Sequence, residues 1–327
     1  MEAQKRLFEI IKSKINVDKY RLSDFIEELL NVSTDSAYRR IRGETELSFS
    51  ELQKICGNYN LSMDNILNYK SNHSVLFHYT AVDFSNQVSY INYITWLLSR
   101  FTTLKLASEK EILSTGLDIP FYHFLKYPEL YFLLLYAWNN TINRKLISYS
   151  NFCENLEKNG IVSIYNEIYN AYISIPSKEI WTTQSIDTIL RLLEHYYETG
   201  AFGGKETVLF LLDQLTNLLD TVKRYADNGY KECKSKIPFS LYVCSVDLEN
   251  NFILTRRDNH LSCHVKLYTI NCMSTDDEFF CSEATKLIDD LISKSTLISG
   301  ASVKERLRFF QSANNKIDIL RNKIELS

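Results

Sequence analysis

Residues 2–67 contain a series of short amphipathic segments, and their spacing limits how this part of the chain can fold. Within each segment apolar residues recur three or four positions apart, as along one face of an α-helix. Phe25, Ile26 and Leu29 are an example, and Ser23 just before them is a residue type that caps helices. The spacing predicts five helices joined by short turns, at 2–15, 23–30, 34–42, 47–55 and 61–67.

The predicted helix at 34–42 carries its charge on the faces that do not pack. Ala37 and Ile41 lie four positions apart and share one face, and Gly43 is placed to end the helix. The other faces carry three arginines: Arg39, Arg40 and Arg42. The major groove of B-DNA admits one helix and presents acceptors to arginine, so this helix suits DNA recognition. The alternative is an ordinary solvated helix face.

Three sequence patterns follow one another in this region. Residues 32–39 have the pattern Val-Ser-x-x-Ser-x-x-Arg, residues 47–52 are Leu-Ser-Phe-Ser-Glu-Leu, and residues 61–67 have Leu-Ser-x-Asp-x-Ile-Leu. Residues 22–67 therefore resemble the phage-repressor, or xenobiotic-response-element, type of helix-turn-helix domain. The resemblance implies a transcription regulator whose helix at 34–42 enters the major groove.

The resemblance also implies which side chains contact DNA. The implied contacts are Ser33, Thr34, Asp35, Tyr38, Arg39, Arg40 and Arg42. Thr34, Asp35 and Tyr38 match positions that meet base edges. Ser33, Arg39 and Arg40 match positions near phosphates or bases. Arg42, at the helix end, matches a phosphate contact.

The chain departs from the family pattern at two places. The family often has a glycine in the turn before the recognition helix, whereas this turn is Asn31-Val32-Ser33. The glutamate that the family often has near the end of that helix is Ile41 here. Phe25 and Ile26 also indicate bulkier packing in the preceding helix.

Overall charge does not indicate a nucleic-acid-binding protein. The chain of 327 residues has 37 Lys and Arg against 40 Asp and Glu, a net charge of −3. Recognition of DNA must therefore depend on where individual charges lie. The start of the chain has no apolar leader, and its longest apolar run, 131–138, is too short to span a membrane. We expect a cytoplasmic protein.

The sequence beyond residue 80 predicts a mainly α fold. The helix-turn-helix domain is expected at 1–70 and a linker at 71–80, and 81–327 is expected to be a helical sensing or dimerisation domain. Residues 241–246, 252–256 and 264–270 are rich in β-branched and aromatic residues and predict a small antiparallel meander. A repressor-type head with a helical body is also similar to the peptide-pheromone-responsive regulators, which implies a peptide or small-molecule effector. The predicted strands count against that second resemblance.

The sequence contains no clear catalytic or metal-binding motif. Residues 200–207 lack the GxxxxGK spacing of a phosphate-binding loop. His260, Cys263 and His264 have no second ligand pair for a structural zinc site. No serine or cysteine lies in a glycine-flanked nucleophile elbow. We therefore expect no enzyme, no metal and no cofactor.

Three hypotheses follow. The first is a homodimeric, sequence-specific DNA-binding transcription regulator whose activity the C-terminal domain modulates. The second is a protein-interaction module that uses the helix-turn-helix fold without specific DNA binding. The third, an enzyme hidden in the body, predicts a pocket with converging titratable groups, and the sequence does not reveal one.

Overall fold

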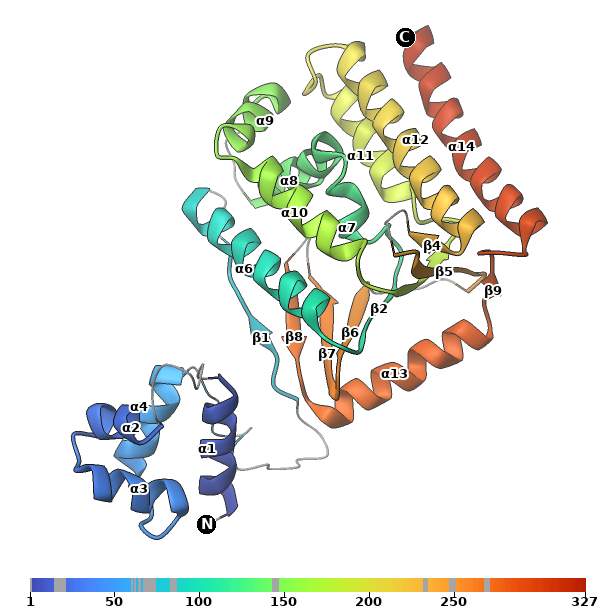
Figure 1. Cartoon of the computed structure of the whole chain (residues 1–327). Coiled ribbons are helices and arrows are strands. Elements are labelled where there is room, and N and C mark those ends of the chain that lie inside the picture. The colour runs from blue at the N-terminus through green and yellow to red at the C-terminus, as the bar shows by residue number, and fades with distance from the viewer. Residues whose placement is uncertain are drawn as a thin grey trace. The chain divides into compact units, whose positions relative to one another are not determined.

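The computed structural model describes residues 2–14, 22–59, 61, 63, 66, 75–82, 87–142, 147–231, 235–246, 251–267 and 271–327. The chain divides into two compact units, Met1–Leu76 and Phe77–Ser327, each with its own hydrophobic core (Figure 1). This division lies within the segment predicted as a linker, 71–80. Residues 71–74 lie outside the described residues, and His78–Tyr79 form strand β1 of the larger unit.

The smaller unit is built from short helices around one apolar core. Its described helices are α1 (Glu2–Lys14), α2 (Leu22–Leu30), α3 (Thr34–Arg42) and α4 (Phe49–Tyr59). The core consists of Leu7, Phe8, Ile11, Ile26, Leu30, Ala37, Ile55, Cys56 and Ile66. These apolar residues recur at helical spacing, so the spacing that predicts the helices also supplies the core. The predicted fifth helix, 61–67, lies largely outside the described residues.

The larger unit is organised around a nine-stranded mixed sheet. The strands in spatial order are β1 (His78–Tyr79), β8 (Cys272–Thr275), β7 (His260–Lys266), β6 (Phe252–Arg257), β2 (Lys110–Thr115), β3 (Ser177–Thr182), β5 (Ile237–Cys244) and β4 (Tyr230–Lys231), with β9 (Thr296–Leu297) paired to β5. The inner pairs β2–β3 and β3–β5 are parallel, and the other pairs are antiparallel.

The sheet shows that the predicted fold class, mainly α with a small meander at 241–270, is wrong. Of the segments predicted as a meander, β6 and β7 do pair antiparallel, but β5 is separated from them by β2 and β3 and pairs with β3 in parallel. Strands β2 and β3 also lie in the part of 81–327 that was expected to be helical. A short apolar run looks alike in a buried strand and in a helix, and only pairing with a distant strand distinguishes the two.

Helices cover both faces of the sheet. They are α6 (Gln87–Leu106), α7 (Phe121–Phe124), α8 (Pro128–Ile142), α9 (Tyr149–Glu157), α10 (Ile161–Tyr172), α11 (Asp187–Glu198), α12 (Lys205–Asn228), α13 (Glu278–Ser293) and α14 (Val303–Leu326). Figure 1 shows α6 beside α10, and α12 beside α14. None of the helices in the described part of the chain has the length and apolar character needed to cross a bilayer.

The two faces of the sheet pack against different cores. Ile112, Trp181 and Phe239 belong to the large core shared with most of the helices. Leu113 and Ile180, one residue away along their strands, belong to a smaller core with α13. Successive side chains of a strand point to opposite faces, so each inner strand contributes to both cores. This explains why the inner strands lack the alternation of a half-exposed strand.

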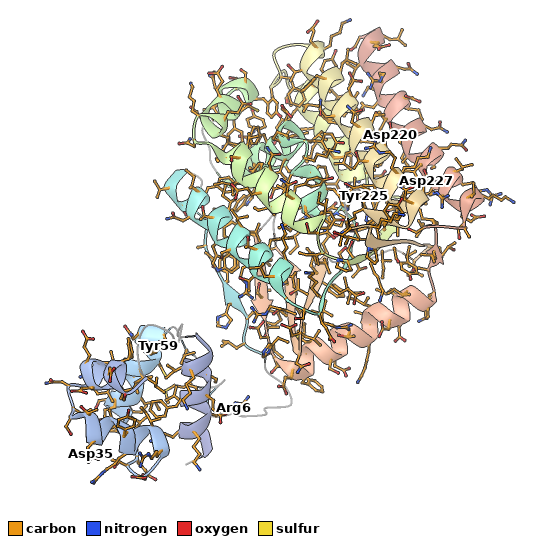
Figure 2. The ribbon with its side chains drawn as sticks, viewed as in Figure 1. Arg6, Asp35, Tyr59, Asp220, Tyr225 and Asp227 are labelled. Atoms are coloured by element: carbon orange, nitrogen blue, oxygen red, sulfur yellow. The ribbon has the colours of Figure 1, made fainter. Side chains whose placement is uncertain are left out.

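Polar contacts fasten α12 to its neighbours. Tyr225 of α12 shares a hydrogen bond of 2.6 Å with the hydroxyl of Tyr169 in α10. Asp227 accepts from Arg306 of α14, whose guanidinium also donates to the Ile298 carbonyl at 2.7 Å. Both α12 residues are labelled in Figure 2. Because Arg306 is buried, its N–H groups need these acceptors. Its hydrogen bonds therefore hold the first turns of α14 beside α12 and Ile298.

A fully buried carboxylate lies on β3. Glu179 accepts hydrogen bonds from His123 at 2.8 Å, Tyr172 at 2.7 Å and Trp181 at 3.1 Å. The Lys231 ammonium lies nearby, 3.6 Å from the centre of the Tyr172 ring. Burial alone would raise the pKa of the Glu179 carboxyl, but His123 and Lys231 together lower it to about 2. The ion is stable inside the protein because these groups replace the water it loses.

We expect Glu179→Gln to lower the free energy of unfolding by about 3 kcal/mol, since it removes the anion that the surrounding donors and cations require. Urea denaturation followed by circular dichroism measures the loss. The matched control is Glu111→Gln, whose carboxylate pairs with Lys178 and Arg256 at a partly exposed site. That change should cost less than about 1 kcal/mol. Equal losses in the two variants would contradict the role assigned to Glu179.

Candidate nucleic-acid interface

The turn between α2 and α3 forms without a glycine. Asn31 adopts a left-handed conformation with φ of 53°, and the Val32 N–H donates to the Glu27 carbonyl at 3.2 Å. Asparagine tolerates this conformation better than other residues that carry a Cβ. Asn31 thus meets the turn's demand for a left-handed residue without a glycine.

Both ends of α3 are capped. The Ser33 hydroxyl accepts from the Ser36 N–H at 3.4 Å. At the other end Gly43 has φ of 80°, and its N–H donates to the carbonyls of Arg39 and Arg40. The helix is therefore limited to nine residues by its own end groups. Ser33, predicted to contact DNA, also serves as the N-cap.

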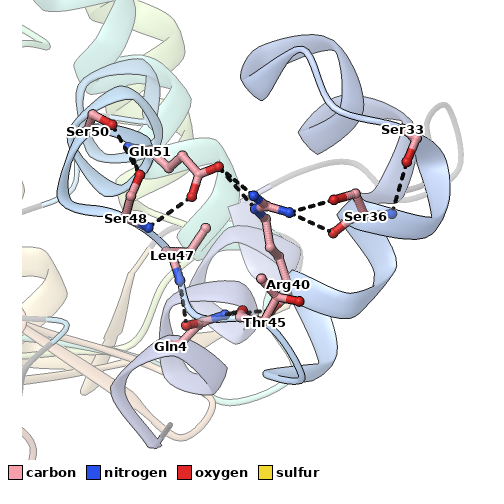
Figure 3. A network of polar contacts seen from close by, with 9 residues as sticks. All are labelled: Gln4, Ser33, Ser36, Arg40, Thr45, Leu47, Ser48, Ser50 and Glu51. Atoms are coloured by element: carbon pink, nitrogen blue, oxygen red, sulfur yellow. Dashed lines mark hydrogen bonds and ion pairs between the residues drawn. The ribbon is translucent and has the colours of Figure 1, made fainter.

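Arg40 is turned inward and holds α3 against α4 (Figure 3). Its guanidinium donates to the Glu51 carboxylate at 2.8 and 3.1 Å, and to the Ser36 hydroxyl at 2.7 Å and carbonyl at 3.2 Å. Only 14% of the side chain is exposed. A guanidinium engaged in this way positions the helix.

Glu51 also forms the N-terminal cap of α4. Its carboxylate accepts from the Ser48 N–H at 2.9 Å, and the Ser48 hydroxyl accepts from the Glu51 N–H at 3.3 Å. This reciprocal pair is a capping box. Burial alone would raise the pKa of the Glu51 carboxyl, but hydrogen bonds from Arg40 and the Ser48 N–H lower it below its usual value.

A side chain of α1 completes this network. The Gln4 amide donates to the carbonyls of Arg40 at 2.7 Å and Thr45 at 2.9 Å, and its oxygen accepts from the Leu47 N–H at 3.2 Å. Gln4 thereby pairs with backbone groups at the end of α3 and in the segment after it. That segment lies outside the helices, so its N–H and C=O groups need side-chain partners. Neither Gln4 nor Glu51 was predicted from the sequence. The spacing Ser48-x-x-Glu51 was the signal that could have identified the carboxylate.

The remaining predicted contacts lie on the outer side of α3. Asp35 and Arg39 form an ion pair at 3.1 Å, with 76% and 59% of their side chains exposed. Figure 2 shows Asp35 at the surface of this unit. Tyr38 is 37% exposed, and the Arg42 guanidinium lies 5.8 Å from the centre of its ring. The Thr34 hydroxyl donates to Glu27 at 2.7 Å.

The exposed arginines are held only loosely by protein acids. Arg39 pairs with Asp35, and Arg42 pairs with Glu44 at 3.6 Å, both in exposed positions. Exposed ion pairs contribute about 0–1 kcal/mol, so a base or phosphate can replace the carboxylate at little cost. The structure therefore brings Thr34, Asp35 and Arg39 together as a surface of donors and acceptors, with Tyr38 and Arg42 beside it.

Comparison with known proteins agrees with this geometry. Residues 13–95 match the family model described as the BetR domain, a helix-turn-helix type of DNA-binding domain. The match spans about a quarter of the chain, includes α2, α3 and α4, and ends within α6. No curated protein and no solved structure matches the chain. The N-terminal unit is thus similar to a helix-turn-helix DNA-binding domain, and the match does not distinguish the phage-repressor type.

We expect Arg40→Ala to destabilise the contact between α3 and α4 by about 2 kcal/mol, because Glu51 would lose its buried cationic partner. Hydrogen exchange of the α3 and α4 amides in the full chain, read by mass spectrometry, measures this local stability. Arg39→Ala is the control and should change exchange little, since its side chain is exposed. Equal protection in all three proteins would show that Arg40 does not hold the helices together.

Protection of α4 should also depend on pH. The pKa of Glu51 is lowered in the folded protein, so its stabilisation is complete above the ordinary value of 4.5 and declines as the pH falls below it. Exchange measured from pH 6 down to pH 3, corrected for intrinsic rates, should show protection falling faster in the wild type than in Glu51→Gln. Parallel curves would contradict this assignment.

Proposed function

We propose that the protein is a sequence-specific DNA-binding transcription regulator in which α3 enters the major groove. The observation that carries this proposal is the division of labour on α3. Arg40 points inward and fixes the helix, while Asp35 and Arg39 remain exposed on its outer side. A helix held rigidly from behind and bearing exposed donors and acceptors is what direct readout requires.

Each exposed residue has a role that its chemistry suits. Arg39 can donate two hydrogen bonds to guanine O6 and N7, and Asp35 can accept from cytosine N4. Thr34 and Tyr38 are close enough to the same surface to contact neighbouring base edges. Arg42 at the end of α3 and Ser33, its N-cap, would contact phosphates. Arg40 acts through its hold on α4 and contributes to binding as a positioning residue.

The protein would act as a homodimer on a two-fold symmetric site. One short recognition helix supplies limited affinity, and two half-sites about 34 Å apart would double the contacts. The larger unit would supply the dimer contacts and modulate binding in response to an effector. A peptide or small-molecule effector remains a proposal.

Selection of bound duplexes from a random oligonucleotide pool tests the proposal. We expect enrichment of a palindrome and, on that sequence, at least about tenfold weaker binding by Arg39→Ala, because one good bidentate contact contributes about 1–3 kcal/mol. Lys12→Ala, which removes an exposed charge from α1, is the matched control and should bind nearly as the wild type does. No enriched sequence would favour a protein-interaction module instead.

The salt dependence separates phosphate contacts from base contacts. Arg42→Ala should weaken binding to all sequences similarly and reduce the slope of log K against log salt by about 1, since one fewer counterion is released. Fluorescence anisotropy at several salt concentrations measures both slopes. An unchanged slope, or a loss confined to the selected sequence, would contradict a phosphate contact at Arg42.

A further inference from the structure

The sheet face beneath α6 is unusually polar for a face that a helix covers. In the register of β6 and β7, Thr255 lies opposite Ser262, Ile253 opposite His264, and Arg257 opposite His260. Partners in register share a face. The alternating residues, such as Leu254 opposite Cys263, point the other way and pack in the core with α13. One face of these strands is therefore close-packed and apolar, and the other carries hydroxyl, imidazole and guanidinium groups.

A cavity of about 130 Å³ lies between α6 and this polar face. The apolar part of its wall includes Trp96 and Phe101 of α6, Phe121 of α7 and Ile253 of β6. Arg100, Arg257, His260 and Lys266 contribute charged or ionisable groups to the same cavity. An apolar space with a few converging polar groups is the usual form of a small-molecule site.

One end of the cavity is neutralised by the protein itself. Lys266 pairs with Asp118 at 2.8 Å, and the Asn251 amide donates to the same carboxylate at 2.8 Å. Burial alone would raise the pKa of the Asp118 carboxyl, but Lys266 lowers it below its usual value. Because the cation and the anion satisfy each other, this end has no need of a charged ligand.

The other positive charges of the cavity have no such acid. Within the described residues neither Arg100 nor Arg257 pairs with a carboxylate, and Arg100 lies 6.0 Å from the centre of the Trp96 ring. Lys110 lies directly opposite Arg257 in the register of β2 and β6. Like charges placed opposite each other are unfavourable, so this corner of the sheet favours an added anion.

We propose that this cavity binds a small organic acid, with its carboxylate at Arg100 and Arg257 and a ring-sized apolar body against Trp96, Phe101 and Phe121. The volume suits such a body, since an apolar cavity of about 150 Å³ holds benzene. Arginine also matches the planar geometry of a carboxylate. Two features of the cavity thus define the ligand class: its size, and two guanidinium groups that pair with no carboxylate among the described residues.

The polar groups favour binding over catalysis. The two ring nitrogens of His264 contact the hydroxyls of Thr255 at 3.2 Å and Ser274 at 2.7 Å, so no carboxylate orients the imidazole as a base. Burial and the charge of Arg100 lower the pKa of this imidazole to about 4. His264 is therefore neutral near pH 7 and serves as a hydrogen-bonding part of the wall. The expectation that the chain is not an enzyme stays a prediction.

Calorimetric titration of the full chain with benzoate and phenylacetate tests the proposal, with benzamide and phenylacetamide as neutral matches of the same size. We expect saturable binding of at least one acid, with each amide binding at least about tenfold more weakly because it lacks the charge. Quenching of Trp96 fluorescence, absent in Trp96→Phe, should follow the same curve. These measurements contain no DNA, so their outcome is independent of the proposed regulatory function.

Variants locate the site. Arg257→Gln should weaken binding of the acid at least about tenfold. Arg256→Gln, one residue away on the opposite face, is the matched control and should bind as the wild type does. Ser262→Leu should fill the cavity and abolish binding, although it leaves every charge in place. This second variant tests the site independently of Arg257→Gln, in case that variant folds poorly. Absence of saturable binding, equal binding of acids and amides, or equal losses at Arg256 and Arg257 would overturn the proposal.

Discussion

Parallel pairing of β2, β3 and β5 is the constraint on which the larger unit depends. These strands are separated in sequence by long helical segments, so their pairing brings the helices together over one face of the sheet. The register sets Ser114 beside Glu179, and Glu179 beside Leu241. A carboxylate in this position loses all its water. The surrounding donors must therefore lie within hydrogen-bonding distance of the carboxylate, and the pairing of the strands places them there.

The same pairing connects the buried carboxylate to the cavity. Ser114 lines the cavity, and its hydroxyl lies 2.9 Å from that of Tyr122, which donates to Glu179 at 3.2 Å. On the other side of β2, the antiparallel strand β6 supplies Thr255 and Arg257 to the cavity. On one face of the sheet, the buried ionic cluster at Glu179 on β3 therefore lies two strands away from the polar cavity wall on β6.

The N-terminal unit uses charge in two ways on a single helix. Arg40 and Glu51 are largely sheltered and hydrogen-bonded, so their contact contributes to the stability of the domain. Arg39 and Arg42 lie in water, where their ion pairs contribute little and can be exchanged for others. Three arginines within four positions therefore have different roles. Their exposure, which depends on packing against α4, decides which role each has.

The sequence by itself determined the described helices of the N-terminal unit, α1 to α4. Local signals sufficed there: apolar residues at helical spacing and the glycine that ends α3. It also placed three arginines on α3, but it could not separate the sheltered Arg40 from the exposed Arg39. That distinction depends on Glu51, which reaches Arg40 only once α4 has packed.

Only the tertiary structure decided the architecture of the larger unit. β2 and β3 each contain only two apolar residues, which is too few to show a period that distinguishes a strand from a helix, and their partners lie far along the chain. Strand pairing then fixed which alternate residues face α13 and which face α6. The cavity beneath α6 follows from that register, because Arg257 and His260 come together across a turn while Arg100 arrives from a separate helix.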